Sequence, residues 1–347
     1  MPPDVDLDDF EYVLPPDRIA QHPAAERDAA RLLVLDRATG ERSHAQIREL
    51  PRWLRAGDLI VVNATRVLPA RLRGRKDSGG AAAALLLGPR AGWTGQFHAL
   101  LKTGGHPRPG QKFRFGPGDD GLDAELFERA SDGEVVLAFE PGADPYAVGE
   151  TPLPPYIRRD APEDEDAERY QTTYARVPGS VAAPTAGLHL SERLLAELDA
   201  SGIARAEVVL HVGPGTFRPV RSGDLARGRL HAETIELSEE TAARIAQTRA
   251  RGGRVVAVGT TSVRVLEACA EADGAVRPTR GETDLFLTPG YAFRAVDALL
   301  TNFHLPRSSL LLLTAAFAGR APLLDAYAEA VRAGYRFYSY GDAMLIL

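Results

Sequence analysis

The 347-residue sequence has little of what marks several classes of protein. Its single cysteine, Cys269, excludes an internal disulfide and a zinc site built on cysteines. The longest apolar runs, such as that around residues 310–313, are far shorter than the roughly 20 residues that cross a bilayer. Residues 1–12 carry five acidic groups and lack the apolar stretch of a signal peptide. We therefore expect a soluble, cytoplasmic protein that does not enter the membrane.

Lysine is scarce, so positive charge comes almost entirely from arginine. Lysine occurs only at positions 76, 102 and 112, and the formal net charge is −6. An acidic balance argues against general nucleic-acid binding, which normally requires a basic domain, but it leaves room for a local basic face. The hydrophobic and charged fractions of 44% and 25% are ordinary for globular proteins and exclude wholesale disorder.

Familiar cofactor signatures are missing as well. The chain has no Gly-x-x-x-x-Gly-Lys-Ser/Thr phosphate loop and no Gly-x-Ser-x-Gly nucleophile elbow. The run 213–215 (GPG) follows a predicted strand, but it lacks the third glycine of a dinucleotide fingerprint. The histidines do not show the paired spacing of metal ligands, so we do not expect a metal site.

The first half of the chain predicts strands. Apolar runs at 31–36 and 58–63 are bounded by turn residues and are typical of short buried strands. Between 66 and 149 the chain holds 15 of its 33 glycines. Six short strand-like stretches recur there: 70–76, 81–87, 95–102, 111–115, 122–129 and 134–140. This spacing predicts an antiparallel sheet or a small barrel. The acidic run 163–166 then suggests a solvated loop in a connector.

After residue 180, helices and strands alternate. Ser191 and Ser238 are expected to cap helices, and further helices are expected at 308–318 and 322–333. Predicted strands occupy 207–212, 230–237, 254–258, 284–287 and 295–300. Such alternation indicates an α/β fold with a mostly parallel or mixed sheet. We predict that 1–65 and 151–347 form one discontinuous α/β domain, into which residues 66–150 insert as a small antiparallel β-barrel.

Histidines and small polar residues gather in loops near strand ends, where open α/β sheets bind ligands. Four side chains are candidates for proton transfer: His189, His211, His231 and Glu233. Seven residues are candidates for substrate positioning: Thr185, Gly213, Thr260, Thr261, Arg264, Asn302 and His304. Structural alternatives stay open, because His211 also fits a core histidine. His231 and Glu233 also fit a surface ion pair. Thr260 and Thr261 also fit the cap of a helix.

A local basic segment offers a contact for RNA. Residues 66–76 hold five basic side chains and no acidic one: Arg66, Arg71, Arg73, Arg75 and Lys76. Alternate placement sets the arginines at 71, 73 and 75 on one face of a strand, where they fit a track of phosphates or a solvated edge. The tail 335–342 interleaves aromatics with one arginine, a pattern of core packing or of a surface that stacks on a base such as adenine.

Eight segments make the sequence resemble the S-adenosylmethionine:tRNA ribosyltransferase-isomerase family of the queuosine pathway. They occur in the family's order along almost the whole chain: 59–72 (LIVVNATRVLPARL), 152–157 (PLPPYI), 169–175 (RYQTTYA), 179–189 (GSVAAPTAGLH), 210–220 (LHVGPGTFRPV), 257–267 (AVGTTSVRVLE), 300–306 (LTNFHLP) and 335–346 (YRFYSYGDAMLI). Departures include Ala64, which stands where the family often has Asp or Asn, and Tyr338, which stands where it often has Phe.

The resemblance implies that the ribosyl part of S-adenosylmethionine moves to preQ1 at the wobble position of tRNA and rearranges to epoxyqueuosine. Adenine and methionine would be released. It implies a two-domain fold of the kind described above, no metal or cofactor, and S-adenosylmethionine consumed as a substrate. We expect a monomer that binds preQ1-containing tRNA. A methyltransferase and a non-catalytic RNA-binding module are the alternatives.

Overall fold

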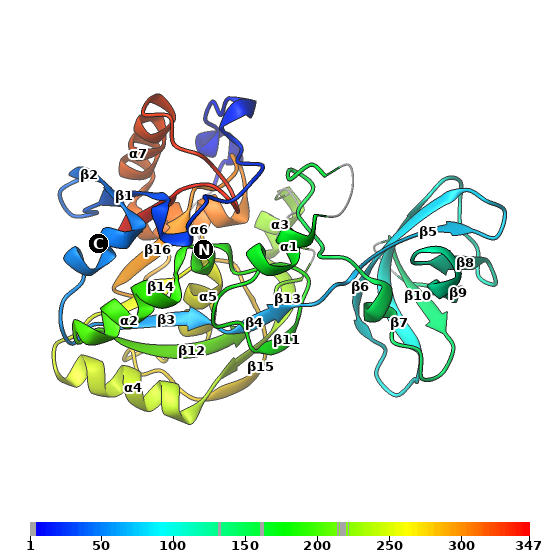
Figure 1. Ribbon diagram of the computed structural model, residues 1–347. Helices are drawn as coiled ribbons and strands as arrows, with labels where there is room; N and C mark the ends of the chain where they lie inside the picture. Colours follow the sequence, from blue (N-terminus) through cyan, green and yellow to red (C-terminus); the bar gives the residue numbers. More distant parts are fainter. Residues whose placement is uncertain (1–4, 131–132, 160–162, 214, 216–219, 221) are drawn as a thin grey trace.

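The computed structural model describes residues 5–130, 133–159, 163–213, 215, 220 and 222–347 (Figure 1). Its main body is a nine-stranded sheet in the order β15-β13-β12-β3-β14-β16-β17-β1-β2. The strands are β1 (Arg31–Leu35), β2 (Arg42–Gln46), β3 (Leu59–Asn63), β12 (Ala204–Leu210), β13 (Arg229–Leu237), β14 (Val255–Val258), β15 (Thr279–Leu285), β16 (Ala298–Asn302) and β17 (Ala343–Ile346). The four central strands, β12, β3, β14 and β16, are parallel to one another, and β13 and β17 pair with them in antiparallel fashion on the two sides. The predicted α/β fold with a mixed sheet is confirmed.

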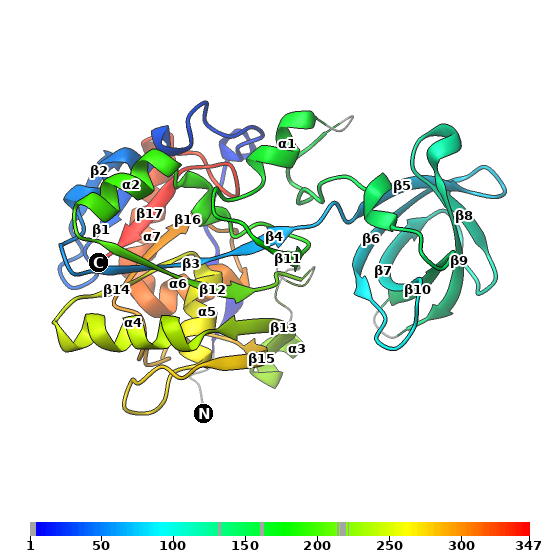
Figure 2. The ribbon, with the colours of Figure 1, turned by 60° about the horizontal axis from the view of Figure 1, so that its bottom comes forward.

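A closed six-stranded antiparallel barrel forms the second part (Figure 2). Its strands are β5 (Arg71–Lys76), β6 (Ala81–Pro89), β7 (Gln96–Thr103), β8 (Lys112–Phe115), β9 (Leu122–Arg129) and β10 (Glu134–Phe139). All six predicted stretches are strands. Ala82 and Ala84 face the barrel interior, where small side chains fit the narrow cross-section. A Cβ at Gly74 would lie 2.1 Å from the carbonyl oxygen of Arg114, so β5 and β8 approach closely only because of this glycine.

The barrel lies to one side of the sheet in both views, beyond the two-stranded pair of β4 (Thr65–Val67) and β11 (Val177–Ser180) (Figures 1 and 2). Every barrel strand falls within residues 66–150, and all nine strands of the sheet fall outside that range. The boundaries of the two predicted domains stay a prediction.

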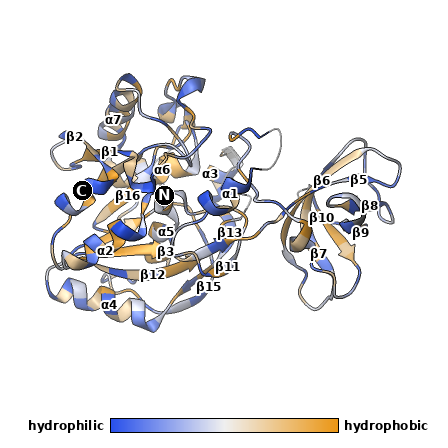
Figure 3. Ribbon diagram, viewed as in Figure 1, coloured by the Kyte–Doolittle hydropathy of each residue, from blue (hydrophilic) through white to orange (hydrophobic). Residues whose placement is uncertain are grey.

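Helices cover both faces of the sheet. The α-helices of the described ranges are α1 (Asp164–Arg169), α2 (Glu192–Ala200), α3 (Ser222–Arg227), α4 (Glu239–Ala250), α5 (Thr260–Ala268), α6 (Ser309–Ala318) and α7 (Arg320–Arg332), and α1 does not pack on the sheet. Side chains alternate along β1, so Leu33 packs with α5, α6 and α7 while Leu32 packs with α2. Burial on both faces explains why β3, β14 and β16 are mostly apolar (Figure 3). Ser191 and Ser238 cap α2 and α4 as predicted, each accepting a hydrogen bond from a backbone N–H three residues on.

Several expectations about individual elements are wrong. The acidic run is not a solvated loop, because it begins α1, where the helix dipole favours carboxylates, and Asp166 is buried against Arg159 at 2.8 Å. The strand expected at 284–287 is β15, which ends at Leu285. The edge strand β2 was missed because its side chains are mostly exposed and polar.

No single helix in the described ranges has the length and hydropathy of a membrane span. Helices α6 and α7 have that length and hydropathy only when they are taken together, and the chain bends by 114° between them.

Candidate active site

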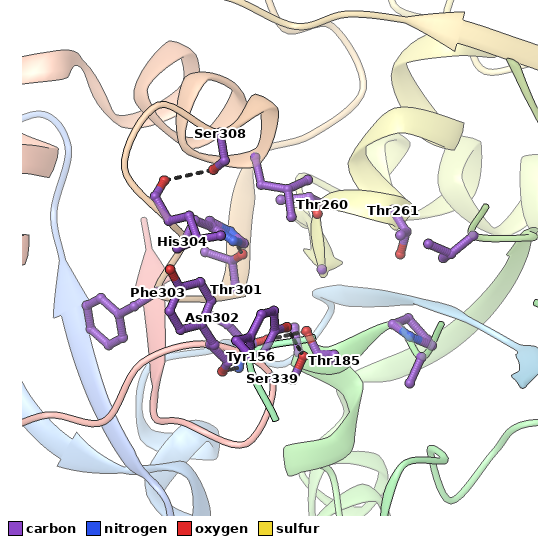
Figure 4. A pocket seen from close by; sticks show the side chains of 18 of the residues that line it. Tyr156, Thr185, Thr260, Thr261, Thr301, Asn302, Phe303, His304, Ser308 and Ser339 are labelled. Atoms are coloured by element: carbon purple, nitrogen blue, oxygen red, sulfur yellow. Dashed lines mark hydrogen bonds between the residues drawn. The ribbon is translucent and has the colours of Figure 1, made fainter. Parts of the chain in front are cut away.

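A small cavity of about 120 Å³ lies at the carboxyl ends of the neighbouring parallel strands β14 and β16 (Figure 4). Among the predicted positioning residues, it is lined by Thr185, Thr260, Thr261, Asn302 and His304. Its described walls contain hydroxyl, amide, imidazole and apolar groups, and no Asp, Glu, Lys or Arg side chain. The cavity therefore fits an uncharged polar group better than an ionic one.

One wall of the small cavity is the start of α5. Gly259, at φ +87°, lets the chain turn from β14 straight into the helix, which places Thr260 and Thr261 at the cavity. The Thr261 hydroxyl oxygen is buried and has no hydrogen-bond partner among the described residues. The predicted cap function of these threonines is not what the structure shows, since no side chain caps α5.

At another wall, two lining side chains and a third behind them form a hydrogen-bonded chain. The Thr185 hydroxyl donates to Oδ1 of Asn302 at 2.8 Å, and Nδ2 of Asn302 lies 3.1 Å from Nε2 of His189. Nδ2 also donates to the carbonyl oxygen of Tyr338 at 3.2 Å. His189 ends a short 3-10 helix, Thr185–His189, and does not line the 120 Å³ cavity. Burial lowers its pKa to about 4.

His304 is likewise a buried, neutral histidine. Its Nε2 lies 2.9 Å from the Thr301 hydroxyl oxygen, and its backbone N–H donates to the Tyr327 hydroxyl oxygen at 2.9 Å. Burial lowers its pKa to about 3. It lines the small cavity as an uncharged group at neutral pH.

A larger cavity of about 630 Å³ adjoins the first and lies between the sheet and the barrel. Val212 and Leu310 line both cavities, so the two are neighbours. The larger cavity is lined by the other predicted residues of the sheet domain: His211, Gly213, His231, Glu233 and Arg264. The barrel contributes Leu86, Gly88, His98 and Glu134. Part of the 210–220 motif, including Pro214 and Thr216, lies outside the described residues.

His211 enters this cavity directly after β12. Its Nδ1 lies 2.8 Å from the hydroxyl oxygen of Thr65, which is fully buried at the start of β4. Gly179 makes room for the ring, since a Cβ there would lie 2.7 Å from the imidazole. Burial lowers the pKa of His211, so the ring is neutral at neutral pH. The half-buried imidazole both makes a structural hydrogen bond and faces the cavity.

Glu233 and Arg264 form a buried ion pair at the same cavity. Their side chains are only 7% and 6% exposed, and Oε1 of Glu233 accepts a hydrogen bond from the Gly213 backbone N–H at 2.9 Å. Arg264 also donates to the carbonyl oxygen of Leu285 at 3.3 Å. Glu233 thus ties the loop after β12 to β13 and α5. His231 lies two residues earlier on β13 and is exposed, whereas Glu233 is buried and paired with Arg264, so His231 and Glu233 do not form the surface ion pair given as an alternative.

Comparison with known proteins decides the family. A family model described as queuosine biosynthesis protein matches residues 7–346. The chain belongs to this family. The S-adenosylmethionine:tRNA ribosyltransferase-isomerase of Anaeromyxobacter dehalogenans (strain 2CP-C) is 52% identical, with 98% of this chain and 99% of that protein covered. That of Methylobacterium sp. (strain 4-46) is 52% identical, with 98% of each chain covered.

The fold comparison agrees with this family assignment. The crystal structure of the S-adenosylmethionine tRNA ribosyltransferase from Thermotoga maritima is 38% identical in sequence and matches with a TM-score of 0.55. The match covers 98% of this chain and 100% of that one.

Sequence reasoning missed several residues of this candidate site. Tyr156 lines the small cavity, stacks on Tyr338 with ring centroids 4.5 Å apart, and hydrogen-bonds to the Ser339 hydroxyl at 2.6 Å. Tyr156 lies in the stretch that the sequence predicts to be a connector, although it belongs to the motif 152–157. Thr65 was missed because a threonine on a short strand carries no signal until His211 is placed beside it.

The predicted basic face is partly neutralised. Arg73 forms an ion pair with Glu150 at 2.8 Å, and the Arg71 guanidinium donates to the carbonyl oxygen of Leu153 at 2.5 Å. Arg66 and Arg75 are exposed, and Lys76 donates to the carbonyl oxygen of Gly104 at 2.9 Å. In the part of the chain that the structure describes, no group of three or more His, Cys, Asp or Glu side chains could hold a metal ion.

The buried histidines predict acid sensitivity. The pKa values of His189 and His304 fall from 6.5 to about 4 and about 3 in the folded protein. Between pH 6.5 and 4 the unfolded chain therefore binds protons at these rings that the folded chain does not bind. Each ring contributes stability that is present above pH 6.5 and lost as the pH falls, on the order of a few kcal/mol.

We expect urea unfolding at pH 7, 5.5 and 4.5 to show a progressive fall in the free energy of unfolding. His189→Gln, which cannot take up a proton, should make that fall shallower. A free energy of unfolding that stays constant from pH 7 to 4.5 would contradict the assignment of both rings as buried and neutral.

Proposed function

We propose that this chain is an S-adenosylmethionine:tRNA ribosyltransferase-isomerase. It transfers the ribosyl moiety of S-adenosylmethionine to preQ1 at the wobble position of tRNA, forms epoxyqueuosine, and releases adenine and methionine. The observation that carries the proposal is the 52% identity, over 98% of the chain, to curated enzymes of that name. The two adjoining cavities support it, because the reaction joins a small molecule to a macromolecular substrate.

We assign one substrate to each cavity. The small cavity, at the strand ends of the sheet, is proposed to hold part of S-adenosylmethionine. The larger cavity opens between the sheet and the barrel, where a nucleotide of tRNA can enter while the barrel contacts neighbouring parts of the RNA. Val212 and Leu310, which line both, mark the place where the two substrates would meet.

The residues at this junction suit the chemistry. The sulfonium of S-adenosylmethionine acidifies the ribose C5′ hydrogens, so a modest base can remove one of them. Among the predicted proton-transfer groups, we propose His211 for this step. It is neutral, it lines the larger cavity, and Thr65 orients its ring. Glu233 is engaged by Arg264 and by the Gly213 amide, so we propose that it holds the cavity wall.

The proposal includes no metal and no bound cofactor, because S-adenosylmethionine is itself consumed. We also propose that the protein acts as a cytoplasmic monomer on preQ1-containing tRNA.

The deciding experiment incubates the protein with S-adenosylmethionine and preQ1-tRNA and identifies the products by mass spectrometry. We expect adenine, methionine and epoxyqueuosine-containing tRNA, and no release of adenine when either substrate is omitted. Treatment with a chelator should leave the rate unchanged. S-adenosylhomocysteine among the products would indicate a methyltransferase instead. Binding of tRNA with S-adenosylmethionine left intact would indicate a non-catalytic RNA-binding module.

The basic segment predicts how tRNA affinity depends on salt. Each phosphate contact that is lost flattens the slope of log K against log salt by about 0.7–0.9. Because Arg73 is paired with Glu150, we expect the exposed Arg66 and Arg75 to contribute most. The double variant Arg66→Gln/Arg75→Gln should flatten the slope by roughly 1.5, measured by filter binding between 50 and 200 mM salt.

The matched control removes the same charge elsewhere. Arg251→Gln/Arg332→Gln alters two exposed arginines at the ends of α4 and α7. It should leave the slope nearly unchanged. Equal effects of the two double variants would show that net charge, and not this basic segment, carries tRNA affinity.

A further inference from the structure

The orientation of the Asn302 amide is determined by its neighbours. The backbone carbonyl of Tyr338 can only accept a hydrogen bond, so the group 3.2 Å from it must be Nδ2. The opposite orientation would set two acceptors against each other in a site where Asn302 is 3% exposed. Tyr338 presents this carbonyl from a backbone with φ +71°, which L-residues rarely adopt. Oδ1 of Asn302 therefore faces Thr185.

His189 completes the same arrangement. With Nδ2 of Asn302 as the donor, Nε2 of His189 must accept, which requires an unprotonated nitrogen there. The imidazole is 5% exposed and does not line the small cavity. It acts on the cavity only through Asn302.

The chain of donors and acceptors sets what the cavity offers to a ligand. The Thr185 hydroxyl has one hydrogen, and that hydrogen is donated to Oδ1 of Asn302 at 2.8 Å. At this position Thr185 is left with lone pairs only. It lines the cavity beside Asn302, Tyr156 and Ser339 (Figure 4). A ligand group that binds there must be a hydrogen-bond donor.

We propose that Thr185 accepts a hydrogen bond from the exocyclic amino group of the adenine of S-adenosylmethionine, and that His189 is a positioning residue that holds Thr185 in this acceptor state through Asn302. This inference rests on the proposed function. The ribose hydroxyls of S-adenosylmethionine both donate and accept, so they do not require a pure acceptor such as Thr185. The groups that can only donate are the adenine amine and the methionine ammonium. The described cavity wall has no carboxylate to balance an ammonium, and the walls are uncharged throughout.

The size and shape of the cavity agree with a nucleobase. Its volume of about 120 Å³ lies below the range of roughly 300 Å³ and more that whole drug-sized ligands occupy, so it holds one fragment of the substrate. The ring of Tyr156, stacked on Tyr338, provides a flat aromatic wall. A neutral, planar base with an outward amine matches these features.

The test compares S-adenosylmethionine with its 6-oxo analogue, S-inosylmethionine, which has a carbonyl in place of the amine. Binding is measured by calorimetry in the presence of tRNA with unmodified guanine at the wobble position. We expect the wild type to prefer S-adenosylmethionine by about tenfold or more, because two acceptors face each other in the analogue complex. Thr185→Val should abolish this preference, and Thr185→Ser should keep it.

His189 is tested through the same preference. His189→Leu removes one of the two acceptors that hold Nδ2 of Asn302 and leaves only the Tyr338 carbonyl. The Asn302 amide and the Thr185 hydroxyl are then less firmly oriented, and selectivity should fall severalfold. His189→Gln, which retains an acceptor oxygen, should restore it. Thr173→Val is the control: it removes a hydroxyl that donates to the Leu190 carbonyl outside the cavity, and it should leave selectivity unchanged. If His189→Leu does not fold, the two Thr185 variants still decide the assignment of the acceptor.

Equal weakening of both ligands by Thr185→Val would overturn the inference and point to the methionine ammonium or to a structural role. Unchanged selectivity in folded His189→Leu would overturn the role of His189. An enzyme that consumes S-adenosylmethionine but shows no Thr185-dependent selectivity contradicts this inference alone. A wild type that leaves S-adenosylmethionine intact with preQ1-tRNA contradicts the proposed function.

Discussion

Replacing His211 by asparagine is expected to lower kcat for adenine release by about 10²-fold or more while the protein stays folded. Asparagine retains a polar atom that can bond to the Thr65 hydroxyl, which lies 2.8 Å from Nδ1 of His211, but it cannot take up a proton. A tautomer with its hydrogen on Nδ1, donated to Thr65, leaves Nε2 unprotonated and able to accept the C5′ proton. The loss should therefore appear in kcat more than in KM.

Two further variants separate catalysis from structure. Thr65→Val removes only the group that orients the ring, so we expect a smaller loss of kcat, about tenfold. His22→Asn changes an exposed histidine that lines neither cavity and should have no effect. Rates are measured under saturating tRNA, with circular dichroism and thermal unfolding as checks on the fold. Near-normal turnover in folded His211→Asn would move the proton-transfer function to His231, the other predicted histidine that lines the larger cavity.

The buried ion pair of Glu233 and Arg264 carries the second large effect. Glu233→Gln keeps the size of the side chain and an oxygen for the Gly213 amide, but it leaves the Arg264 guanidinium without its carboxylate. An unpaired buried charge costs about 3–5 kcal/mol. We expect a loss of this order in the free energy of unfolding, measured in urea at pH 7.

A double variant tests the origin of that loss. Glu233→Met together with Arg264→Leu removes both charges, so much of the stability should return, because a buried pair and an apolar pair of similar volume differ little. Kinetics provide a second readout. If Glu233 is instead the base, Glu233→Gln would lower kcat at least 10²-fold without a large change in stability. If Glu233→Gln unfolds at the same urea concentration as the wild type and keeps its activity, the ion pair of Glu233 and Arg264 is solvated.

Local patterns in the sequence determined much of the fold. The six barrel strands were predictable because each is a short run between glycine, proline and aspartate turns. Their pairing was not, because β5 pairs with β8 and β7 with β10, across intervening strands. Ser191 and Ser238 were predictable as caps because a helix start depends on a residue and the amide three positions on. The family motifs likewise indicated which loops carry polar side chains.

Tertiary structure alone decided which of those side chains line which cavity. One predicted site became two adjoining cavities. His189 lies behind Asn302 and outside both cavities, in a contact between residues 113 positions apart. His211 contacts Thr65, which is 146 positions away in the sequence. In the predicted arginine face, Arg73 is paired with Glu150, which lies 77 residues away in the sequence.

Such contacts depend on how distant segments pack, and no local pattern of residues encodes them. The residue types in the sequence determined which chemistry is available to this protein. The geometry of the folded chain decided which groups are donors, acceptors or neutral bases, because burial and hydrogen-bond partners set those states.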